Sequence, residues 1–427
     1  MQILRRDFLR GAAILTAGAT LTVARRSTGQ DGQDAGFGPL QPDPEGNLEL
    51  PEGFSYRILQ TRGDRMTDLQ VAPDLPDGMA CFEAEDGNWV LMRNHERGEG
   101  TNPQPEVAFD PEALGGVTRL VLNPESLDVI SSNQVLVGTL RNCAGGPSPW
   151  GWLSCEETDF EDAGHGFVFR CDPEASEAQA AEPIEAYGRF KHEAVAVDPR
   201  RLVAYLTEDQ GDSCFYRFVP DNEREPFVGT LQALAVVGND LFDTSPDLEV
   251  GDALEVRWID VPDPSAATER TATQAQALGA AVFARGEGCW WSEEERAVYF
   301  TCTTGGPVNG GQVFRLDPTT DGGTLTLVAQ SQGDGALVSP DNLTVSPWGD
   351  LIVCEDSLLG NNHLRGITPE GTLYDLARNV RSGGISEFAG VCFSPDGKVL
   401  FVNLQLPGLT LAITGPFPDP PRRGCFG

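Results

Sequence analysis

A six-fold recurrence of short strands is the feature of this 427-residue sequence that most limits its fold. One strand-like segment recurs, in order, as "WVLMRNHE", "GWLSCEE", "VAYLTED", "AVYFTCT", "DLIVCED" and "VLFVNLQ". The segment after it recurs as "TRLVLNP", "FVFRCDP", "FYRFVP", "VFRLDP", "LRGITPEG" and "LTLAIT". Units of roughly fifty residues, each made of several short strands, are typical of propeller blades. The sequence therefore predicts an all-β fold, a six-bladed β-propeller with a central channel, and a two-sheet sandwich is the alternative.

The spacing between the third and fourth units is longer than the others, which indicates an insertion at about residues 225–282. Its segment "PDPSAATERTATQAQALGAAVF" is rich in Ala, Gln, Glu and Arg, so we expect it to be partly helical. The insertion could form a lid over the channel or a surface decoration. Residues 31–427 are otherwise expected to form one propeller domain.

The N-terminus resembles an export signal of the twin-arginine type. Arg5 and Arg6 precede a mildly apolar run from Gly11 to Ala24, which is too short and too rich in small residues for a stable membrane span. We expect residues 1–30 to be this signal, with the export machinery as a partner and a periplasmic or extracellular location. No other segment is long and apolar enough to cross a bilayer, so the processed protein should have no membrane span, and we expect a monomer.

The charge balance of the chain excludes some classes of partner. The chain has 64 Asp and Glu against 30 Lys and Arg, a net charge of −34, which argues against nucleic acid and anionic membranes as partners. The acids either solvate the surface or hold cations.

The sequence has ten cysteines, most of them inside apolar strand-like runs and none in a CxxC pair. We therefore expect mainly buried free thiols, with one or two disulfides at most.

Acidic side chains recur where the inner strand of each unit begins and where its second strand ends. Antiparallel pairing puts these two points at the same edge of a sheet. So many carboxylates cannot all ionise without cations, because each raises the pKa of the next. The sequence thus predicts a metal cluster at one mouth of the channel. Its inner-strand members are Asp77, Cys143, Glu193, Glu287, Asp341 and Glu387, and its second-strand members are Glu96, Glu156, Glu157, Glu208, Asp209, Glu355 and Asp356.

The residue types indicate which ions and ligands to expect. Carboxylate oxygens suit Ca²⁺, Mn²⁺ or Fe³⁺, and a thiolate from Cys143 would favour a transition metal beside calcium. Arg285 is either a cation for an anionic substrate or a salt-bridging arginine. The sequence lacks a GxSxG elbow, an HExxH zinc helix and a GxxxxGK[ST] phosphate loop.

Five motifs together resemble the PhoX-type alkaline phosphatase family of exported bacterial proteins. They are "NCAGGPSPWGWLSCEE", "GRFKHEAVAVDP", "YLTEDQGDSCFYRFVP", "ARGEG" and "SPDNL". The resemblance implies a six-bladed propeller and a site of iron and calcium ions (Fe³⁺ and Ca²⁺) that hydrolyses phosphate esters. It implies iron ligands at Cys143, Glu193 and Glu287, and further, mostly calcium, ligands at Glu156, Glu157, Glu208, Asp209 and Asp341.

The resemblance also implies a substrate contact at Arg285 and two departures from the family pattern. Thr158 stands where family members commonly have an asparagine that helps to bind phosphate, and it keeps a hydroxyl donor. The arginine motif reads Arg-Gly-Glu rather than Arg-Pro-Glu. The expected function is hydrolysis of a small-molecule phosphomonoester. The alternatives are a calcium-dependent propeller hydrolase of another ester, such as a lactonase, and a non-catalytic calcium-binding propeller.

Overall fold

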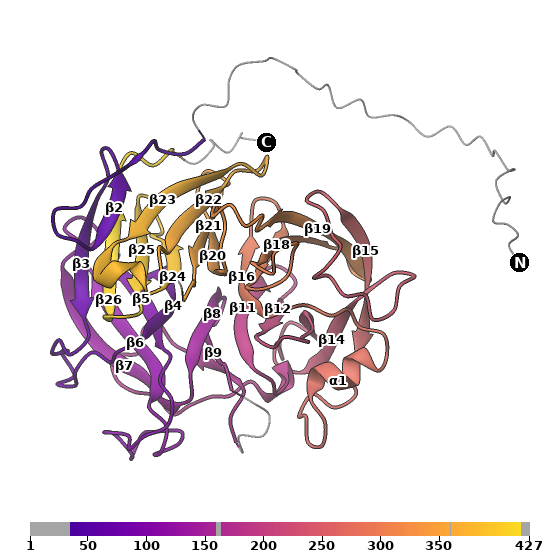
Figure 1. The fold of residues 1–427 in the computed structure, drawn as a ribbon. Helices are drawn as coiled ribbons and strands as arrows, with labels where there is room; N and C mark the ends of the chain where they lie inside the picture. The colour runs from indigo at the N-terminus through magenta and orange to yellow at the C-terminus, as the bar shows by residue number, and fades with distance from the viewer. Residues whose placement is uncertain (1–34, 159–163, 359, 420–427) are drawn as a thin grey trace, which may run out of the picture. The chain divides into compact units, whose positions relative to one another are not determined.

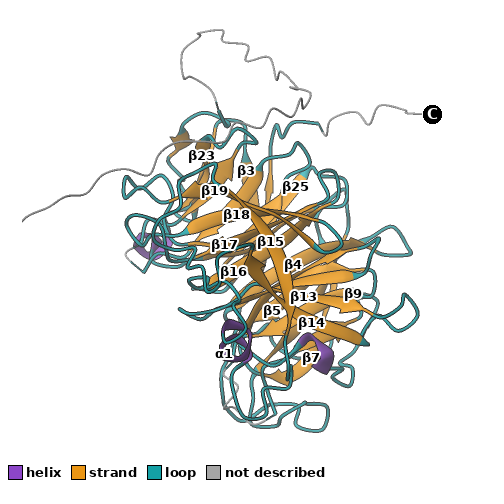
Figure 2. Ribbon diagram, turned by 90° about the vertical axis from the view of Figure 1, so that its right-hand side faces the viewer, coloured by secondary structure: helices purple, strands orange, loops and turns teal. Residues whose placement is uncertain are grey.

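The computed structural model describes residues 35–158, 164–358 and 360–419. The chain divides into two units, residues 1–33 and residues 34–427, and every described element belongs to the second. The predicted export signal, residues 1–30, lies outside the described residues. Figures 1 and 2 show that the described chain is built almost entirely of strands. The predicted all-β, propeller-like arrangement is confirmed.

The first two predicted units form two separate antiparallel sheets. The first sheet has the order β4 (Pro76–Glu83), β5 (Trp89–His95), β6 (Gly115–Leu122) and β7 (Val129–Thr139). The second has the order β8 (Asn142–Ser148), β9 (Gly151–Glu156) and β10 (Val168–Cys171). In each unit the strand that comes first in the sequence lies at one end of its sheet.

The third and fourth units share one nine-stranded sheet. The third contributes β11 (His192–Asp198), β12 (Val203–Glu208), β13 (Tyr216–Pro220) and β14 (Gly229–Val236). The fourth contributes β16 (Gly286–Ser292), β17 (Ala297–Cys302), β18 (Gln312–Pro318) and β19 (Gly322–Gln330). The extra strand β15 (Ala253–Asp260) pairs with both β14 and β19 and so joins the two units.

The last two units are completed by strands from the start of the described chain. The fifth is β20 (Pro340–Val345), β21 (Leu351–Glu355), β22 (His363–Ile367) and β23 (Leu373–Asn379), extended by β2 (Leu48–Pro51) and β1 (Leu40–Gln41). The sixth is β24 (Phe388–Phe393), β25 (Val399–Leu404), β26 (Leu409–Thr414) and β3 (Ser55–Thr61). Figure 1 shows the late strand β26 beside the early strand β3, with which it pairs. This pairing ties the two ends of the described chain into one blade.

The inner strands of the six units follow one another around the channel. Within the described residues β4 contacts β8, β8 contacts β11, and the series continues through β16, β20 and β24 back to β4. The indole of Trp290 packs against three separate core clusters and lines the small residual space between the inner strands. Little open space, about 20 Å³, therefore remains between the inner strands at this level.

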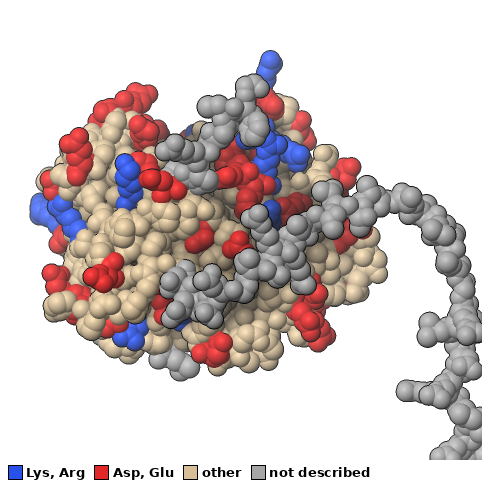
Figure 3. Space-filling view, turned by 90° about the horizontal axis from the view of Figure 1, so that it is seen from above, with Lys and Arg blue, Asp and Glu red and all other residues tan. Residues whose placement is uncertain are grey.

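The segment predicted as an insertion, residues 225–282, contains β14, β15 and one short helix, α1 (Thr271–Gln276). Two short 3-10 turns lie at Glu185–Tyr187 and Arg381–Gly384. None of the described helices has the length and apolar character needed to span a bilayer. Nine cysteines are free, as predicted, and Cys425 lies outside the described residues. Asp and Glu side chains recur over the face drawn in Figure 3, where Lys and Arg are few.

Candidate metal centre at one mouth of the channel

The same irregularity begins the inner strand of every unit. In the first unit Pro76 pairs with His95 and Met79 pairs with Arg93, so the inner strand holds one residue more than its partner. A bulge of this kind changes the direction in which the neighbouring side chains point. The bulge recurs in the other five inner strands after Asn142, His192, Gly286, Pro340 and Ala389. Since these strands pair with the ends of the second strands, all six bulges lie at one edge of the sheets, which we call the mouth.

The residue directly after each bulge start is the predicted inner-strand ligand in five units. These residues are Asp77, Cys143, Glu193, Glu287 and Asp341. In the sixth unit the equivalent residue is Gly390, not Glu387 as the sequence alignment suggested. A Cβ on Gly390 would lie 2.1 Å from the carbonyl oxygen of Asp77, and its φ is +64°, so only glycine fits there. Glu387 reaches the mouth from the loop just before β24.

The paired acids at the ends of the second strands divide into two kinds. The first acid of each pair is buried and holds nearby backbone. Glu156 accepts hydrogen bonds from the amides of Leu140 (2.8 Å), Gly166 (2.8 Å) and Phe167 (3.2 Å). It also accepts one from Nδ1 of His165 at 2.8 Å. Both of its oxygens are thus engaged by the protein.

Glu208 and Glu355 occupy the equivalent position and behave in the same way. Glu208 accepts a hydrogen bond from the hydroxyl of Tyr216 at 2.7 Å, and Arg270 of the loop before α1 lies 3.6 Å away. Glu355 accepts hydrogen bonds from the amide of Val338 (2.9 Å) and from Nε of Arg365 (2.8 Å). Burial raises the pKa of Glu208 to about 7, although its hydrogen bond with Tyr216 and the charge of Arg270 oppose the rise. These first acids lie behind the mouth and anchor its loops.

The second acid of each pair faces the mouth. The equivalent position, one residue past the paired strand end in five units, is acidic in four of them and Thr303 in the fourth unit; the acids are Glu96, Glu157, Asp209 and Asp356. In each of these units the backbone amide of this residue donates a hydrogen bond to a backbone carbonyl on the inner strand's side, that of the residue two positions before the inner-strand ligand. Examples are the amide of Glu157 bonded to the carbonyl of Arg141 at 2.9 Å and the amide of Asp209 bonded to the carbonyl of Lys191 at 3.1 Å. This repeated backbone bond fixes both sets of side chains relative to each other.

The structure brings seven carboxylates into three overlapping groups. In each group one oxygen per residue lies within 4.8 Å of the others. The groups are Asp77, Glu96 and Glu387; Glu193, Glu287 and Asp341; and Asp341, Asp356 and Glu387. We call these seven residues the mouth cluster. Four of them, Asp77, Glu96, Asp356 and Glu387, lie outside the ligand set that the resemblance implied, although the repeat pattern had already marked them.

The mouth cluster carries strongly perturbed carboxyl groups. Burial, with repulsion from Glu287 and Asp341, raises the pKa of Glu193 well above its ordinary value. Burial and repulsion from Asp209 and Asp341 do the same to the pKa of Glu287. Burial and repulsion from Glu96 and then Asp341 raise the pKa of Asp77, whose Oδ1 is buried without a hydrogen-bond partner in the described structure. Without cations, therefore, these groups resist ionisation more than ordinary carboxyl groups do.

Cys143 lies beside the cluster with its thiol directed at backbone. Its Sγ is 3.3 Å from the carbonyl oxygen of His192 and 3.6 Å from that of Glu193. Burial, with the charges of Glu193 and Glu157, raises the pKa of the thiol well above its ordinary value. His192 is buried, and Nε2 of its ring donates a hydrogen bond to the carbonyl of Gly188 at 3.0 Å. His192 does not join any of the three groups found among the described residues.

Arg285 is bonded to two of the acids at the mouth, Asp209 and Glu287. Its Nε and Nη2 donate to the two oxygens of Asp209 at 2.7 and 2.9 Å, and Nη2 also donates to Glu287 at 2.9 Å. Its φ is +58°, a conformation held by backbone hydrogen bonds to Gln210 and from Thr303. Both earlier alternatives for Arg285 therefore remain, since it forms salt bridges and also faces the cluster. Thr158, directly after Glu157, is buried.

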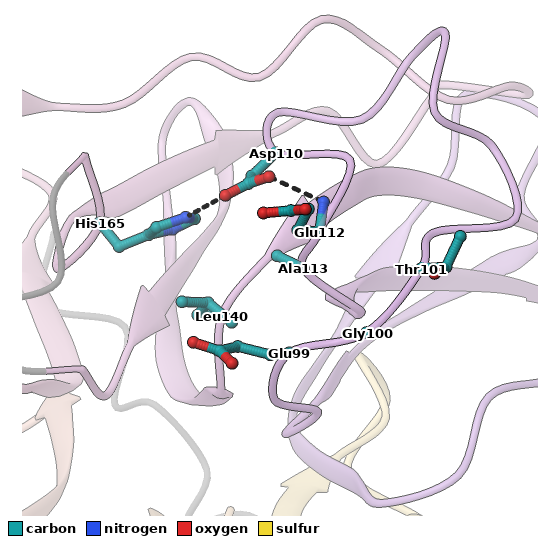
Figure 4. Close-up of a pocket in the computed structure, with 8 residues that line it drawn as sticks. All are labelled: Glu99, Gly100, Thr101, Asp110, Glu112, Ala113, Leu140 and His165. Atoms are coloured by element: carbon teal, nitrogen blue, oxygen red, sulfur yellow. Dashed lines mark hydrogen bonds and ion pairs between the residues drawn. The ribbon is translucent and has the colours of Figure 1, made fainter.

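A cavity of about 560 Å³ adjoins the mouth beside Leu140. Figure 4 shows His165 and Asp110 bonded to each other at its wall, with the carboxylates of Glu99 and Glu112 nearby. Because His165 lies between Glu156 and Asp110 (3.2 Å), its pKa is raised, although burial opposes the rise. The cavity thus has an acidic lining that is linked to the mouth through Glu156.

The fold and the mouth define a β-propeller protein with a cluster of carboxylates, suited to hold a metal ion, at one mouth of its channel. The sequence matches the family described as "Alkaline phosphatase PhoX" over residues 35–128 and 126–408. The chain belongs to this family, which confirms the resemblance found in the motifs. It is a phosphoric monoester hydrolase of the alkaline phosphatase type.

Comparison with one solved structure supports the fold, and two others match less well. PhoX of Pseudomonas fluorescens in complex with vanadate, a transition state analogue, matches at 18% identity and a TM-score of 0.67, covering 87% of this chain and 96% of that one. A gluconolactonase of Xanthomonas campestris matches at 14% identity and a TM-score of 0.43, covering 90% and 99%. A protein of unknown function from Bacteroides thetaiotaomicron matches at 11% identity and 0.48, covering 84% and 76%. No curated protein matches the sequence.

Proposed function

We propose that this chain is an exported phosphomonoesterase whose mouth cluster holds iron and calcium ions. The observation that carries the proposal is the group formed by Glu193, Glu287 and Asp341, which lies beside Arg285 in a chain of the alkaline phosphatase PhoX family. A site for a phosphate ester needs positive charge where the phosphoryl oxygens bind. The mouth cluster is instead strongly acidic, so bound cations are required before it can attract such a substrate.

The residues present fit this requirement. The cluster offers only carboxylate oxygens, which suit hard cations such as Ca²⁺ and Fe³⁺. The unpartnered Oδ1 of buried Asp77 is explained by a cation, since a buried oxygen without a partner costs free energy. Cys143 adds a sulfur next to Glu193, and we propose that its thiolate is a ligand of iron, with Glu193 and Glu287. Glu157, Asp209 and Asp341 are proposed as further ligands, mainly of calcium.

Glu156 and Glu208 were implied as ligands by the family resemblance, and we now assign them a different role. Their oxygens bind amides and side chains behind the mouth, as described above. A carboxylate with both oxygens engaged in this way has little capacity left for a cation. We propose that they position the loops that carry Glu157 and Asp209.

The chain's own residues would orient the substrate. When bound, the cations would neutralise the carboxylates and act as Lewis acids on the phosphoryl group. Arg285 holds its guanidinium in place by its bonds to Asp209 and Glu287, which leave Nη1 without a hydrogen bond among the described residues. We propose that Nη1 donates to a phosphoryl oxygen and stabilises the charge that develops there. Thr158 would supply a hydroxyl donor where relatives commonly supply an amide.

Metal analysis joined to an activity assay tests this function. The purified protein should contain iron and calcium and should hydrolyse p-nitrophenyl phosphate, and chelation should abolish turnover until the metals are restored. Glu287→Gln and Cys143→Ala should lose metal and at least about a hundredfold in kcat together. Glu85→Gln, an exposed carboxylate in the turn at the opposite edge of the first sheet, is the matched control. Full activity in Cys143→Ala protein that contains no metal would refute the proposal.

Export by the twin-arginine route is proposed from the sequence of residues 1–30. Replacing Arg5 and Arg6 together by lysine should retain the phosphatase in the cytoplasm, whereas the natural chain should appear in the periplasm or medium. Equal distribution of both proteins between the fractions would contradict this route. We also propose a monomer, which size-exclusion chromatography with light scattering can check.

A further inference from the structure

One backbone position recurs at the mouth just outside the mouth cluster. It lies two residues before the inner-strand ligand, and its carbonyl accepts the repeated hydrogen bond from the amide of the second acid. In order around the mouth, this position is held by Leu75, Arg141, Lys191, Arg285, Ser339 and Phe388. Four of them, Leu75, Arg141, Arg285 and Ser339, have a left-handed backbone conformation. Lys191 lacks this conformation, although its carbonyl accepts the same repeated hydrogen bond, from the amide of Asp209.

Three consecutive members of this series are basic and the other three are uncharged. Arg141, Lys191 and Arg285 belong to the second, third and fourth units, and we call them the basic arc. The chain has only 30 basic residues against 64 acidic ones, and only two of its basic residues are lysines. Three cations at this position in three successive units therefore lie on one side of the mouth.

The charges of the basic arc act on the acids that follow the second strands. The charges of Lys191 and Arg141 both lower the pKa of Glu157 against the effect of burial, and Arg141 also acts on Glu96. Arg141 is exposed, and its guanidinium has no hydrogen bond or ion pair among the described residues. Arg285, in contrast, is tied to Asp209 and Glu287. Arg141 is thus a free guanidinium at the edge of the site.

The place of the arc determines what it can contact in a bound ester. With the proposed function, the phosphoryl group reaches the buried carboxylates Glu193 and Glu287 beside Arg285, so the rest of the ester points outward toward exposed residues such as Arg141. On the opposite side of the mouth the recurring position is held by Leu75, Ser339 and buried Phe388, which carry no charge. Acidic residues outnumber basic ones by 64 to 30 in the chain, so the side of the mouth that carries the arc is the side that attracts an anionic substituent.

We propose that Arg141, assisted by Lys191, binds a second anionic group on the ester substituent, so that the site prefers phosphomonoesters that carry a carboxylate or a further phosphate near the ester bond. This inference rests on the proposed phosphomonoesterase function. Arg141 is then a specificity-determining residue, whereas Arg285 serves the phosphoryl group of every substrate.

Two substrates that differ only in charge test the inference. The metal-loaded full chain is assayed with phenyl phosphate and 3-carboxyphenyl phosphate. The natural protein should prefer the carboxylated ester, and Arg141→Gln should lower kcat/KM for that ester about tenfold more than for phenyl phosphate, chiefly through KM, since one charge-assisted hydrogen bond is lost. Arg141→Lys should retain most of the preference. Arg200→Gln, at the turn between β11 and β12 on the opposite edge, should leave it unchanged.

The outcomes separate the two proposals. An equal loss for both esters, or no loss for either, in Arg141→Gln would overturn the role of Arg141 while leaving the phosphomonoesterase standing. Absence of turnover of both esters by the natural, metal-loaded chain would remove the proposed function and this inference with it. A preference that falls as salt is raised supports the arc, because exposed charge interactions are screened.

Discussion

Glu157 provides a direct test of whether the carboxyl groups at the mouth of the metal-free protein resist ionisation. Burial and repulsion from Asp209 and Glu96 raise its pKa to about 8, although Lys191 and Arg141 oppose the rise. An unperturbed glutamate has a pKa of 4.5. The folded metal-free protein therefore binds a proton that the unfolded chain releases between these two values, and its stability must fall as the pH rises.

The size of the effect follows from the two pKa values. The contribution of Glu157 is fully present below about pH 4.5 and is lost as the pH rises through about 8. Each pH unit inside this window lowers the free energy of unfolding by about 1.36 kcal/mol. The loss amounts to about 2.5 kcal/mol between pH 5 and pH 7, after allowing for partial titration of the unfolded chain at pH 5. Glu157→Gln cannot ionise, so its stability should lack this component. The difference between the two proteins isolates Glu157 from the other titrating acids.

Urea unfolding in the presence of a chelator measures the effect. The free energy of unfolding of the natural protein, relative to Glu157→Gln, should decrease by about 2.5 kcal/mol between pH 5 and pH 7. Added Ca²⁺ should remove most of this decrease, because a bound cation stabilises the ionised carboxylate. If the free energy of unfolding of the natural protein relative to Glu157→Gln stayed constant over this pH range, or rose with pH, the raised pKa of Glu157 in the metal-free protein would be refuted.

Three further perturbations test the framework of the mouth. Glu156→Ala should lower the free energy of unfolding of chelated protein by about 4 kcal/mol, because buried amides of Leu140 and Gly166 lose their acceptor. Trp290→Ala should cost about 3 kcal/mol by leaving a cavity between the inner strands. Gly390→Ala should cost about 3 kcal/mol and weaken Ca²⁺ binding measured by titration calorimetry, because the new methyl group meets Asp77.

Matched controls make these outcomes decisive. Glu85→Gln, at an exposed turn, should unfold like the natural protein, and Gly98→Ala, whose new methyl group would meet nothing within 4 Å, should neither destabilise nor weaken Ca²⁺ binding. If Glu156→Ala were as stable as Glu85→Gln, its hydrogen bonds would not anchor the loop. If Gly390→Ala bound Ca²⁺ as tightly as Gly98→Ala, Asp77 would lie outside the cation site.

The paired acids mark the limit of what the sequence could predict about the site. In "CEET" the two glutamates are chemically identical, and the repeat pattern marks both as candidates. The structure separates them, because successive residues leaving a strand point in different directions. Glu156 turns back to amides and His165, whereas Glu157 faces the mouth. Nothing in the local sequence specifies which member of a pair does which.

The sixth unit shows a second limit. Alignment by residue type matched Glu387 to Asp77 and Asp341, but the pairing of Ala389 with Asn403 places Gly390 at that position. Close approach of the backbone of Asp77 requires a glycine there. Glu387 still reaches the cluster, from the loop before the strand. The sequence therefore predicted that Glu387 belongs to the acidic cluster, but not how the backbone brings it there.

By itself, the sequence determined the class of fold and the family, because strand periodicity, turn residues and short motifs are local features that recur unit after unit. It also determined that carboxylates converge on one edge, since antiparallel pairing leaves no other arrangement. Only the tertiary structure decided which carboxylates share a site, which of them anchor loops, and that Arg141, Lys191 and Arg285 lie on one side of the mouth. These relations depend on bulges and on contacts between units far apart in the chain, and no local pattern encodes them.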